Sequence, residues 1–512
     1  AALAPHVREA PPLLLSPWRR TGERPRLAGR WRAARATAVK ETQQVSAAEV
    51  DEPDSWVLSK FAAGVFGLYL ASPMLSLIDS AFVGRLSGTG QLAALGPGSV
   101  ICDSSAYCLS CIAVATTNLY ASRRARGQLV AMRRMASDAL TIGLLCGVGL
   151  GLVIGSCAGP LLGMFAVDAT VGQHALSYVR VRAVGMPLVL LTTAAQAVCL
   201  GDRDSKTPVF AILAAGVANV LGDAALVPRY GAAGAAAATV LAQILGAAVL
   251  LVVLRRRQLR LAAGIGARSF LPLGLAARAG PGPFMTVPSR RASRRFLALA
   301  LPVFLALLGK IVFINSLTIA ASGVGTVGLA VHQIVFNQFN FFCKAGDSLG
   351  AAAQAYLPAA FVQGGGGSGD PRGAPARRLI LRMVRLSASW GVVNAALASL
   401  LPLLLAGVFT SDPAVQAGVG TVALQMAVGL LLHCTTLTLE GVILASGSGK
   451  WLAKVYWVNS VLFAGGLWLS VRRWPGLSTV WMAMMLFQGV RLAQFSWRTR
   501  EDHWRQSANA SP

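Results

Sequence analysis

Charged side chains are scarce in this sequence, and acidic ones are the scarcest. Lys, Arg, Asp and Glu make up 13% of its 512 residues, whereas soluble proteins usually have about a quarter. Because 55% of the residues are hydrophobic, there is too little polar surface for a soluble globular protein. Apolar stretches of roughly 20 residues recur from Phe61 to about Gln494, each long enough to cross a bilayer as a helix. The sequence therefore predicts a protein that spans the lipid bilayer many times.

Residues that bind metals or nucleotides, or that form disulfides, do not occur in the required patterns. The five histidines are scattered from His6 to His503, and the eight cysteines all lie inside apolar stretches. Cys108 and Cys111 have no further zinc ligands at a suitable spacing. The Gly447–Lys450 stretch does not complete a Walker motif. We therefore expect neither a cofactor nor an enzyme active site.

The net charge of +26 comes from basic residues in the N-terminal tail and in the connections between apolar stretches. Membrane topology explains this distribution better than a nucleic-acid-binding surface does, so no nucleic-acid partner is expected. Residues 1–40 contain eight arginines and Lys40 but only two acidic residues, Glu9 and Glu23. Such Arg-rich, acid-poor N-termini are typical of organellar transit peptides. The alternative is a disordered basic tail on a cytoplasmic terminus.

Twelve spans are predicted, at approximately 61–83, 91–120, 139–166, 175–199, 208–228, 232–254, 296–320, 327–359, 379–409, 414–446, 451–471 and 475–497. Loops after even-numbered spans, taken with the first turns that follow, carry 24 Lys and Arg, whereas loops after odd-numbered spans carry six. Basic loops stay on the cytosolic side, or on the stromal side in a plastid. Both termini and the central loop are therefore expected there. Glycines every fourth residue over 143–155 predict close helix packing.

The chain also looks doubled around a central stretch, Arg255–Arg295, that is rich in Arg, Gly and Pro. Leu92–Gly96 is echoed by Leu329–Gln333 at an offset of 237, and Thr193–Gln196 by Leu437–Glu440 at an offset of 244. Two sets of six spans share one orientation, so they are parallel repeats with the substrate between them. The expected segments are a basic tail over 1–55, an N-lobe over 56–256, a linker over 257–293, a C-lobe over 294–500 and a tail over 501–512.

Charged side chains inside the spans are functional candidates because they are costly in a bilayer. Asp79 lies about 18 residues into span 1 and Asp223 about 15 into span 5, counted from the basic face, which gives similar depths of roughly 22 to 27 Å. Asn219 lies one turn before Asp223. These side chains could share a proton or a sodium ion, and two neighbouring carboxylates favour uptake of a proton.

In the second half, Lys310 and Asp347 also lie at matching depths. An ion pair between them is one interpretation, because an unpaired lysine would be costly there. Lys344, three residues before Asp347, is an alternative partner. The sharper interpretation is that Lys310 contacts an anionic substrate.

Three more polar positions remain open at this stage. His332 and Gln333 begin span 8 and are cavity candidates, although a capping or satisfied interior role is equally open. Glu440, near the basic end of span 10, is either a gate residue or a solvated charge at a helix end. Asp103 in span 2 is a further charged candidate.

Several motifs, in order along the chain, resemble the multidrug and toxic compound extrusion (MATE) family. They are Asp79–Arg85, Leu92–Gly98, Val114–Leu119, Gln196 with Asp204, Lys206 and Pro208, Asn219 with Asp223, Gly231–Thr239, His332–Gln333, Gln354, Phe409–Asp412 and Glu440–Gly441. The resemblance covers about residues 56–497. Cys102–Asp103, Tyr107, Lys310 and Gly346–Asp347 further resemble the plastid branch of the family, to which a plant isochorismate exporter belongs.

This resemblance implies an all-α membrane protein with twelve transmembrane helices in two six-helix lobes that form a V. It also implies secondary antiport coupled to H⁺ or Na⁺. The implied cation-coupling residues are Asp79, Asn219 and Asp223; the substrate cavity would be lined by Lys310, His332, Gln333, Asp347 and Gln354, with Gln196 and Glu440 at the gate.

The expected function is export of a small organic compound, in the sharper interpretation an organic anion, across a plastid envelope membrane by a monomer. One alternative is extrusion of cations or xenobiotics across another membrane. Another is a lipid-linked precursor flippase of the same superfamily, although such proteins usually lack the set of Asp79, Asn219 and Asp223. A membrane enzyme would need a catalytic set that is missing, and the doubled plan suits alternating access better than a channel.

Overall fold

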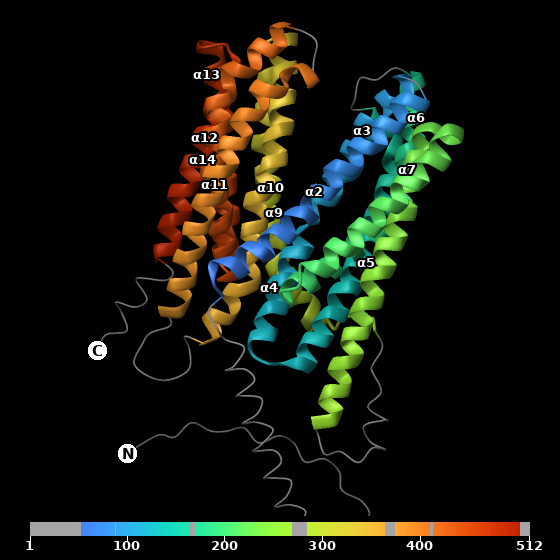
Figure 1. Cartoon of the computed structure of the whole chain (residues 1–512), viewed down its shortest axis with the longest axis vertical. Helices are drawn as coiled ribbons and strands as arrows, with labels where there is room; N and C mark the ends of the chain where they lie inside the picture. The colour runs from blue at the N-terminus through green and yellow to red at the C-terminus, as the bar shows by residue number, and fades with distance from the viewer. Residues whose placement is uncertain are drawn as a thin grey trace, which may run out of the picture.

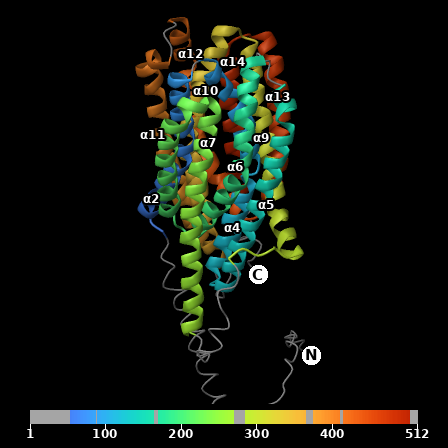
Figure 2. The same ribbon diagram turned by 90° about the vertical axis from the view of Figure 1, so that its right-hand side faces the viewer.

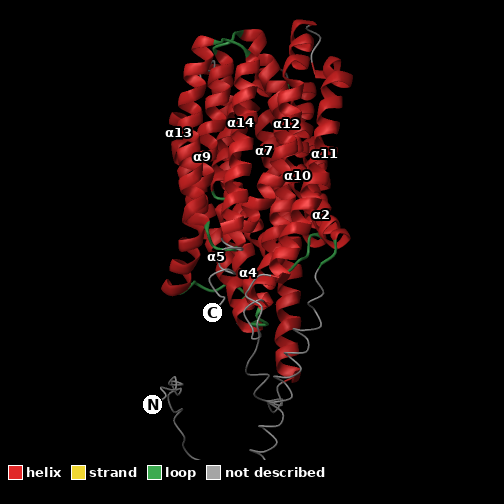
Figure 3. Ribbon diagram, turned by 90° about the vertical axis from the view of Figure 1, so that its left-hand side faces the viewer, coloured by secondary structure: helices red, strands yellow, loops and turns green. Residues whose placement is uncertain are grey.

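Long helices make up the described structure. The computed structural model describes residues 53–87, 89–163, 169–268, 284–363, 374–409 and 413–501, and these ranges contain no strand (Figure 3). The helices are α2 (Ser55–Leu86), α3 (Thr89–Cys108), α4 (Cys111–Ala125), α5 (Leu129–Leu162), α6 (Ala169–Gly201), α7 (Lys206–Arg268), α9 (Arg290–Ser322), α10 (Thr326–Gln363), α11 (Ala374–Phe409), α12 (Pro413–Ala445), α13 (Gly449–Arg473) and α14 (Leu477–Arg500). The expected transit segment falls almost wholly on residues 1–52, outside the described residues.

Eight helical stretches of the described residues are long and apolar enough to cross a membrane. α3 and α4 belong to one such stretch, Ala94–Ala125, while α7 makes two passes because the chain turns back at Gly231. α10, α11 and α14 run lengthwise through the bundle together with α9, α12 and α13 (Figure 1 and Figure 2). The described helices thus confirm the predicted all-α membrane fold. α7 continues to Arg268, beyond the position 257 at which we expected the linker to begin.

The helices form two lobes, α2–α7 and α9–α14, which meet at one end and diverge toward the other (Figure 1). We call these the closed end and the open end. α2 begins, α7 ends, α9 begins and α14 ends at the closed end. The basic connections on both sides of the central linker therefore share one face of the bundle. That this face is cytosolic or stromal stays a prediction from the charge distribution.

Small residues allow α5 and α6 to approach closely within the N-lobe. Gly143, Gly147 and Gly151 of α5 face the backbone of α6, and a Cβ atom at any of them would lie 2.6 to 2.7 Å from a backbone atom of that helix. A larger side chain would push the helices apart. These glycines therefore pack the helices as the four-residue spacing predicts.

An apolar seam joins the two lobes at the closed end. Leu58 and Phe61 of α2 are buried in one cluster with Tyr356 of α10. The rings of Phe61 and Tyr356 meet edge to face, with their centroids 5.4 Å apart. Asn118 of α4 donates a hydrogen bond from Nδ2 to Oε1 of Gln354 in α10, at 3.5 Å. The lobes are thus sealed by side chains of α2 and α4 against α10.

Gly231 makes the reversal inside α7. Its φ of 53° and ψ of −130° are a backbone conformation that only glycine adopts readily. Gln91 closes the turn, because its Oε1 accepts a hydrogen bond from the backbone N–H of Ala232 at 2.7 Å. A side chain at position 231 would collide with Gln91. The position therefore admits glycine alone.

We expect Gly231→Ala to destabilise the protein by roughly 1 to 3 kcal/mol, because alanine is strained at this φ and ψ. The melting temperature of the purified protein in detergent should fall. Gly149→Ala is the matched control, since Gly149 is helical and a Cβ there would contact nothing within 4 Å. Equal melting temperatures for the two variants would contradict this account of the turn.

Candidate transport site

Two carboxylates and one amide come together inside the N-lobe. Asp79 lies in α2, while Asn219 and Asp223 lie one turn apart in α7. Asn219 Nδ2 donates hydrogen bonds to Asp79 Oδ1 at 2.7 Å and to Asp223 Oδ2 at 3.0 Å. Asn219 and Asp223 are fully buried, and Asp79 is 6% exposed. The structure thus encloses in one cluster the three side chains that the sequence places at a common depth.

This cluster has oxygen atoms left over to bind a proton or a small cation. Among the described residues, Oδ1 of Asn219 and Oδ1 of Asp223 are buried without a hydrogen-bond partner. Buried polar atoms are nearly always satisfied, so unsatisfied ones require a specific reason. Two ionised carboxylates on one amide would also repel each other at low dielectric. A bound proton or cation would relieve both costs.

Thr239, from the second pass of α7, also contacts the cluster. Its Oγ1 donates to Asp79 Oδ2 at 3.3 Å and to the carbonyl oxygen of Ala235 at 2.9 Å. Sequence reasoning did not assign Thr239 to the site. It could have been predicted from its position, because Thr239 ends the Gly231–Thr239 motif and lies in the span that follows the one with Asp223.

Arg182 corrects the charge count made from the sequence. It was counted among the basic residues that mark loops, but it lies in α6 and is 8% exposed. Its Nη2 is 2.6 Å from Oδ1 of Asp103 in α3. Because this arginine compensates a carboxylate within the bundle, it says nothing about topology. Its removal from the count strengthens the charge asymmetry.

In the C-lobe, Asp347 pairs with Lys344 and not with Lys310. Both partners lie in α10, three residues apart, with Nζ 3.2 Å from Oδ2. Lys310 of α9 instead has its Nζ 5.9 Å from the ring centroid of Tyr456 in α13. The interpretation of a Lys310–Asp347 ion pair is therefore corrected. The nearer lysine on the same helix face takes the carboxylate.

A second ion pair crosses the C-lobe. Arg491 of α14, which is 1% exposed, has its Nη2 3.0 Å from Oε2 of Glu440 in α12. Tyr456 Oη donates to the same oxygen at 2.6 Å. Arg491 Nη1 donates to Gln488 Oε1 at 2.8 Å, and Gln488 Nε2 is 3.1 Å from His433 Nδ1. Glu440, expected at a gate, thus ties α12 to α13 and α14 inside the lobe.

Arg491 is not among the residues singled out from the sequence. It lies six residues inside the predicted span of 475–497 and is the one charged residue of that span. The cost of an isolated charge in a span, which singled out Asp79 and Lys310, applies to it equally. The same argument would have identified it.

The remaining candidates lie in different places. His332 is 1% exposed, and its ring stacks on that of Phe336 with the centroids 5.5 Å apart, so it lies in the interior of the C-lobe; its role in a substrate cavity stays a prediction. Gln354 lies at the seam between the lobes. Gln196 is half-buried in α6. The side chain of Gln333 lies outside the part of the chain that the structure describes.

The two lobes differ in local charge. The N-lobe cluster has two carboxylates and no cation within its hydrogen bonds. In the C-lobe spans, the carboxylates of Asp347 and Glu440 are both paired, with Lys344 and Arg491. Lys310 forms no ion pair within 4 Å among the described residues, although Glu440 and Asp347 lie near enough to interact with it electrostatically. Tyr107 of α3, in the other lobe, also lies near enough for such an interaction.

Comparisons with known proteins agree with this architecture. The MatE family model matches residues 66–225. Protein DETOXIFICATION 47, chloroplastic, of Arabidopsis thaliana is 29% identical over 446 residues, which cover 85% of this chain and 76% of the relative. Protein DETOXIFICATION 44, chloroplastic, of the same plant is 26% identical over 455 residues, covering 85% and 80%.

Solved structures show the same fold. A crystal structure of MATE in the bent conformation has a TM-score of 0.75 at 18% identity, covering 89% of this chain and 98% of the other. The outward-facing conformation of a multidrug resistance MATE family transporter has a TM-score of 0.72 at 16% identity, with the same coverage. The chain is thus similar to MATE proteins in sequence over residues 66–225 and to MATE transporters in fold over most of its length.

We expect Asp79→Asn and Asp223→Asn each to abolish gradient-driven transport, because each removes one ionisable group from the shared cluster while keeping its size. Transport is measured in proteoliposomes with an imposed pH or sodium gradient. Asp54→Asn is the control: Asp54 caps α2 by accepting a hydrogen bond from Val57 N–H at 2.8 Å, and asparagine caps equally well. Full coupled transport in either cluster variant would assign these residues to packing alone.

We expect Arg491→Met alone to destabilise the protein by about 3 to 5 kcal/mol, because it leaves Glu440 buried without its cation. Adding Glu440→Gln should recover most of this loss, since the amide still accepts the hydrogen bond from Tyr456. Thermal unfolding in detergent measures both effects. Arg290→Met, at the exposed start of α9, should change stability little. A double variant as unstable as Arg491→Met would refute the ion pair's role.

Proposed function

We propose that this chain is a MATE-type antiporter that exports a small organic anion across a plastid membrane in exchange for H⁺ or Na⁺. Each lobe has one task in this proposal. The acidic cluster of the N-lobe carries the coupling ion, and the cationic junction of the C-lobe attracts the substrate.

The proposal rests mainly on the position of the Lys310 ammonium group inside the helical bundle. An ammonium group inside a membrane bundle is costly unless an anion compensates it. The two carboxylates of the surrounding spans, Asp347 and Glu440, form their ion pairs with Lys344 and Arg491, so Lys310 has no direct ion pair within the described helices and can accept one from a ligand. A substrate carboxylate at this position would supply the missing partner. The ring of Tyr456 supports the ammonium group from one side.

The N-lobe cluster supports a coupling role because its charge can be neutralised reversibly. Asn219 holds both carboxylates through one amide nitrogen. The cluster can therefore bind or release a proton or a sodium ion while its side chains stay in place. The presence of the ion then changes the local charge by one unit, which can bias the packing of α2 against α7.

A plastid location is supported by two separate features. Residues 1–40 are rich in arginine and poor in acidic residues, as transit peptides are. The names of two relatives that match most of this chain describe those proteins as chloroplastic. Import of a fusion of residues 1–60 to a fluorescent reporter tests this part of the proposal.

Lys310→Met should weaken binding of small carboxylates about tenfold or more, because the substrate loses its counter-ion. The test compares radiolabelled carboxylates with their amide and amine analogues, in binding assays on the purified protein. Lys310→Arg keeps the charge and should retain affinity. The double variant Lys344→Met with Asp347→Leu removes the neighbouring pair at constant net charge and is the matched control. Unchanged carboxylate affinity in Lys310→Met, or preferred binding of the amines, would favour extrusion of cations instead.

A further inference from the structure

Arg203 joins the two lobes from an unusual backbone conformation. It lies in the short connection between α6 and α7, with a φ of 61°, which is rare for a residue with a side chain. Its guanidinium carbon lies 4.5 Å from the ring centroid of Tyr356 in α10. The connection belongs to the N-lobe and Tyr356 to the C-lobe. A strained residue of one lobe thus covers an aromatic ring of the other at the closed end.

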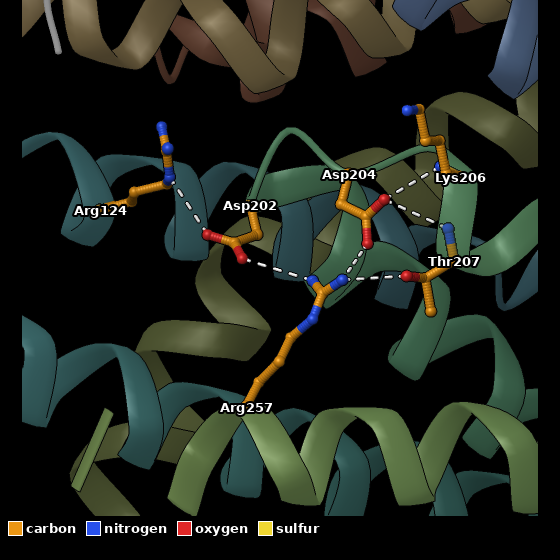
Figure 4. Close-up of polar contacts among 6 residues, drawn as sticks. All are labelled: Arg124, Asp202, Asp204, Lys206, Thr207 and Arg257. Carbon is orange, nitrogen blue, oxygen red and sulfur yellow. Dashed lines mark hydrogen bonds and ion pairs between the residues drawn. The ribbon is translucent and has the colours of Figure 1, made fainter. Parts of the chain in front are cut away.

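Arg257 fixes this connection on both sides of Arg203. Its Nη1 donates to Oδ2 of Asp202 at 3.5 Å, and its Nη2 donates to Oδ2 of Asp204 and, at 2.9 Å, to Oγ1 of Thr207 (Figure 4). Arg124 of α4 holds the other oxygen of Asp202 through its Nε, at 3.1 Å. One forked side chain therefore binds the residues directly before and after Arg203.

Asp204 also fixes the start of α7. Its Oδ1 accepts hydrogen bonds from the backbone N–H groups of Lys206 and Thr207, at 3.0 and 3.2 Å. Burial would raise the pKa of Asp204, but hydrogen bonds from Thr207 and Arg257 outweigh it and hold the pKa below its ordinary value. The Asp204 carboxylate is thus ionised at neutral pH and can pair with the Arg257 guanidinium.

From this geometry we propose that Arg203 is the latch that holds the closed end of the transporter shut, and that Arg257 is the residue that positions it. The inference rests on the transport cycle proposed above, in which the closed end must open for substrate to enter from that face. Opening separates α2 from α10 and breaks the contact of Arg203 with Tyr356. The contacts of Arg257 lie within the N-lobe and can persist. Backbone strain at Arg203 survives only while its neighbours hold it, and such strain often marks a moving part.

The position of Arg257 gives this latch a connection to the linker. Arg257 lies in the last part of α7, which leads directly into the segment joining the lobes. Thr286 lies just before α9, on the other side of that segment. Its backbone N–H donates a hydrogen bond to Oγ of Ser137 in α5, at 2.8 Å. Both sides of that segment are therefore held by helices of the N-lobe.

Hydrogen–deuterium exchange of the protein in lipid nanodiscs tests the latch without substrate or gradient. The readout is exchange in residues 58–68 of α2 and 351–360 of α10, which meet at the seam. Arg203→Gly should accelerate exchange in both segments by about fivefold, the effect of losing one cation–π contact. Glycine accepts the positive φ, so this variant keeps the turn. Arg126→Ala, an exposed arginine at the same end of the N-lobe, is the charge-matched control and should match the wild type.

Three further variants identify the mechanism. Tyr356→Phe keeps the ring and should behave as the wild type, whereas Tyr356→Ala should open the seam. Arg257→Lys keeps the charge but loses the planar fork whose two nitrogens reach Asp202 and Asp204 separately, so it should open the seam partly. If Arg257 acts only by positioning Arg203, combining Arg257→Lys with Arg203→Gly should add nothing to the effect of Arg203→Gly alone.

Wild-type exchange in Arg203→Gly would overturn the latch, as would equal acceleration in Arg126→Ala. Additive effects of the Arg257 and Arg203 variants would overturn the positioning role. None of these results depends on the substrate. Failure of the latch would leave the anion proposal standing, and failure of the anion proposal would leave the latch standing.

Discussion

The cost of burying charge at low dielectric is the constraint on which this structure depends. Each charged group in the spans must be paired, bridged by a hydrogen-bonding group or left for a ligand. Arg182 with Asp103, Lys344 with Asp347 and Arg491 with Glu440 are paired. Among the described residues, the carboxylates bridged by Asn219 and the ammonium group of Lys310 are two exceptions to this pairing. These exceptions lie in different lobes and have opposite sign, which is the arrangement an exchanger of a cation for an anion needs.

The closed end shows how the lobes can be held and released. The seam includes the apolar cluster around Phe61 and Tyr356, a hydrogen bond from Asn118 to Gln354, another from Arg382 of α11 to the carbonyl oxygen of Pro53, and the stacking of Arg203. None of these contacts is an ion pair between the lobes. Ion pairs are instead used within the N-lobe, where Arg257 and Arg124 hold the connection that carries Arg203. Ion pairs thus stabilise the N-lobe itself, whereas weaker contacts join it to the C-lobe. Repeated opening of the closed end requires this difference.

The sequence predicted the helices and the N-lobe cluster because both depend on local patterns. Apolar length determines the spans, and two carboxylates at equal depth from one face must lie near each other when α2 packs on α7. The C-lobe was harder to predict because depth alone does not tell which of two lysines meets Asp347. Side-chain direction decides this, and the lysine on the same helix is closer. The pairing of Glu440 with Arg491 was not foreseen for a related reason: it depends on which faces of α12 and α14 meet in the packed bundle.

The central claim is that the coupling ion and the substrate use different lobes. The most direct measurement records internal pH, or internal sodium, together with uptake of a radiolabelled carboxylate in the same proteoliposomes. The account predicts that wild-type protein moves ion and carboxylate in opposite directions at a fixed ratio. It predicts that the N-lobe and C-lobe variants fail differently, with anion binding kept when the carboxylates are neutralised and lost when Lys310 is. Loss of both activities to the same degree in both variants would contradict separate sites.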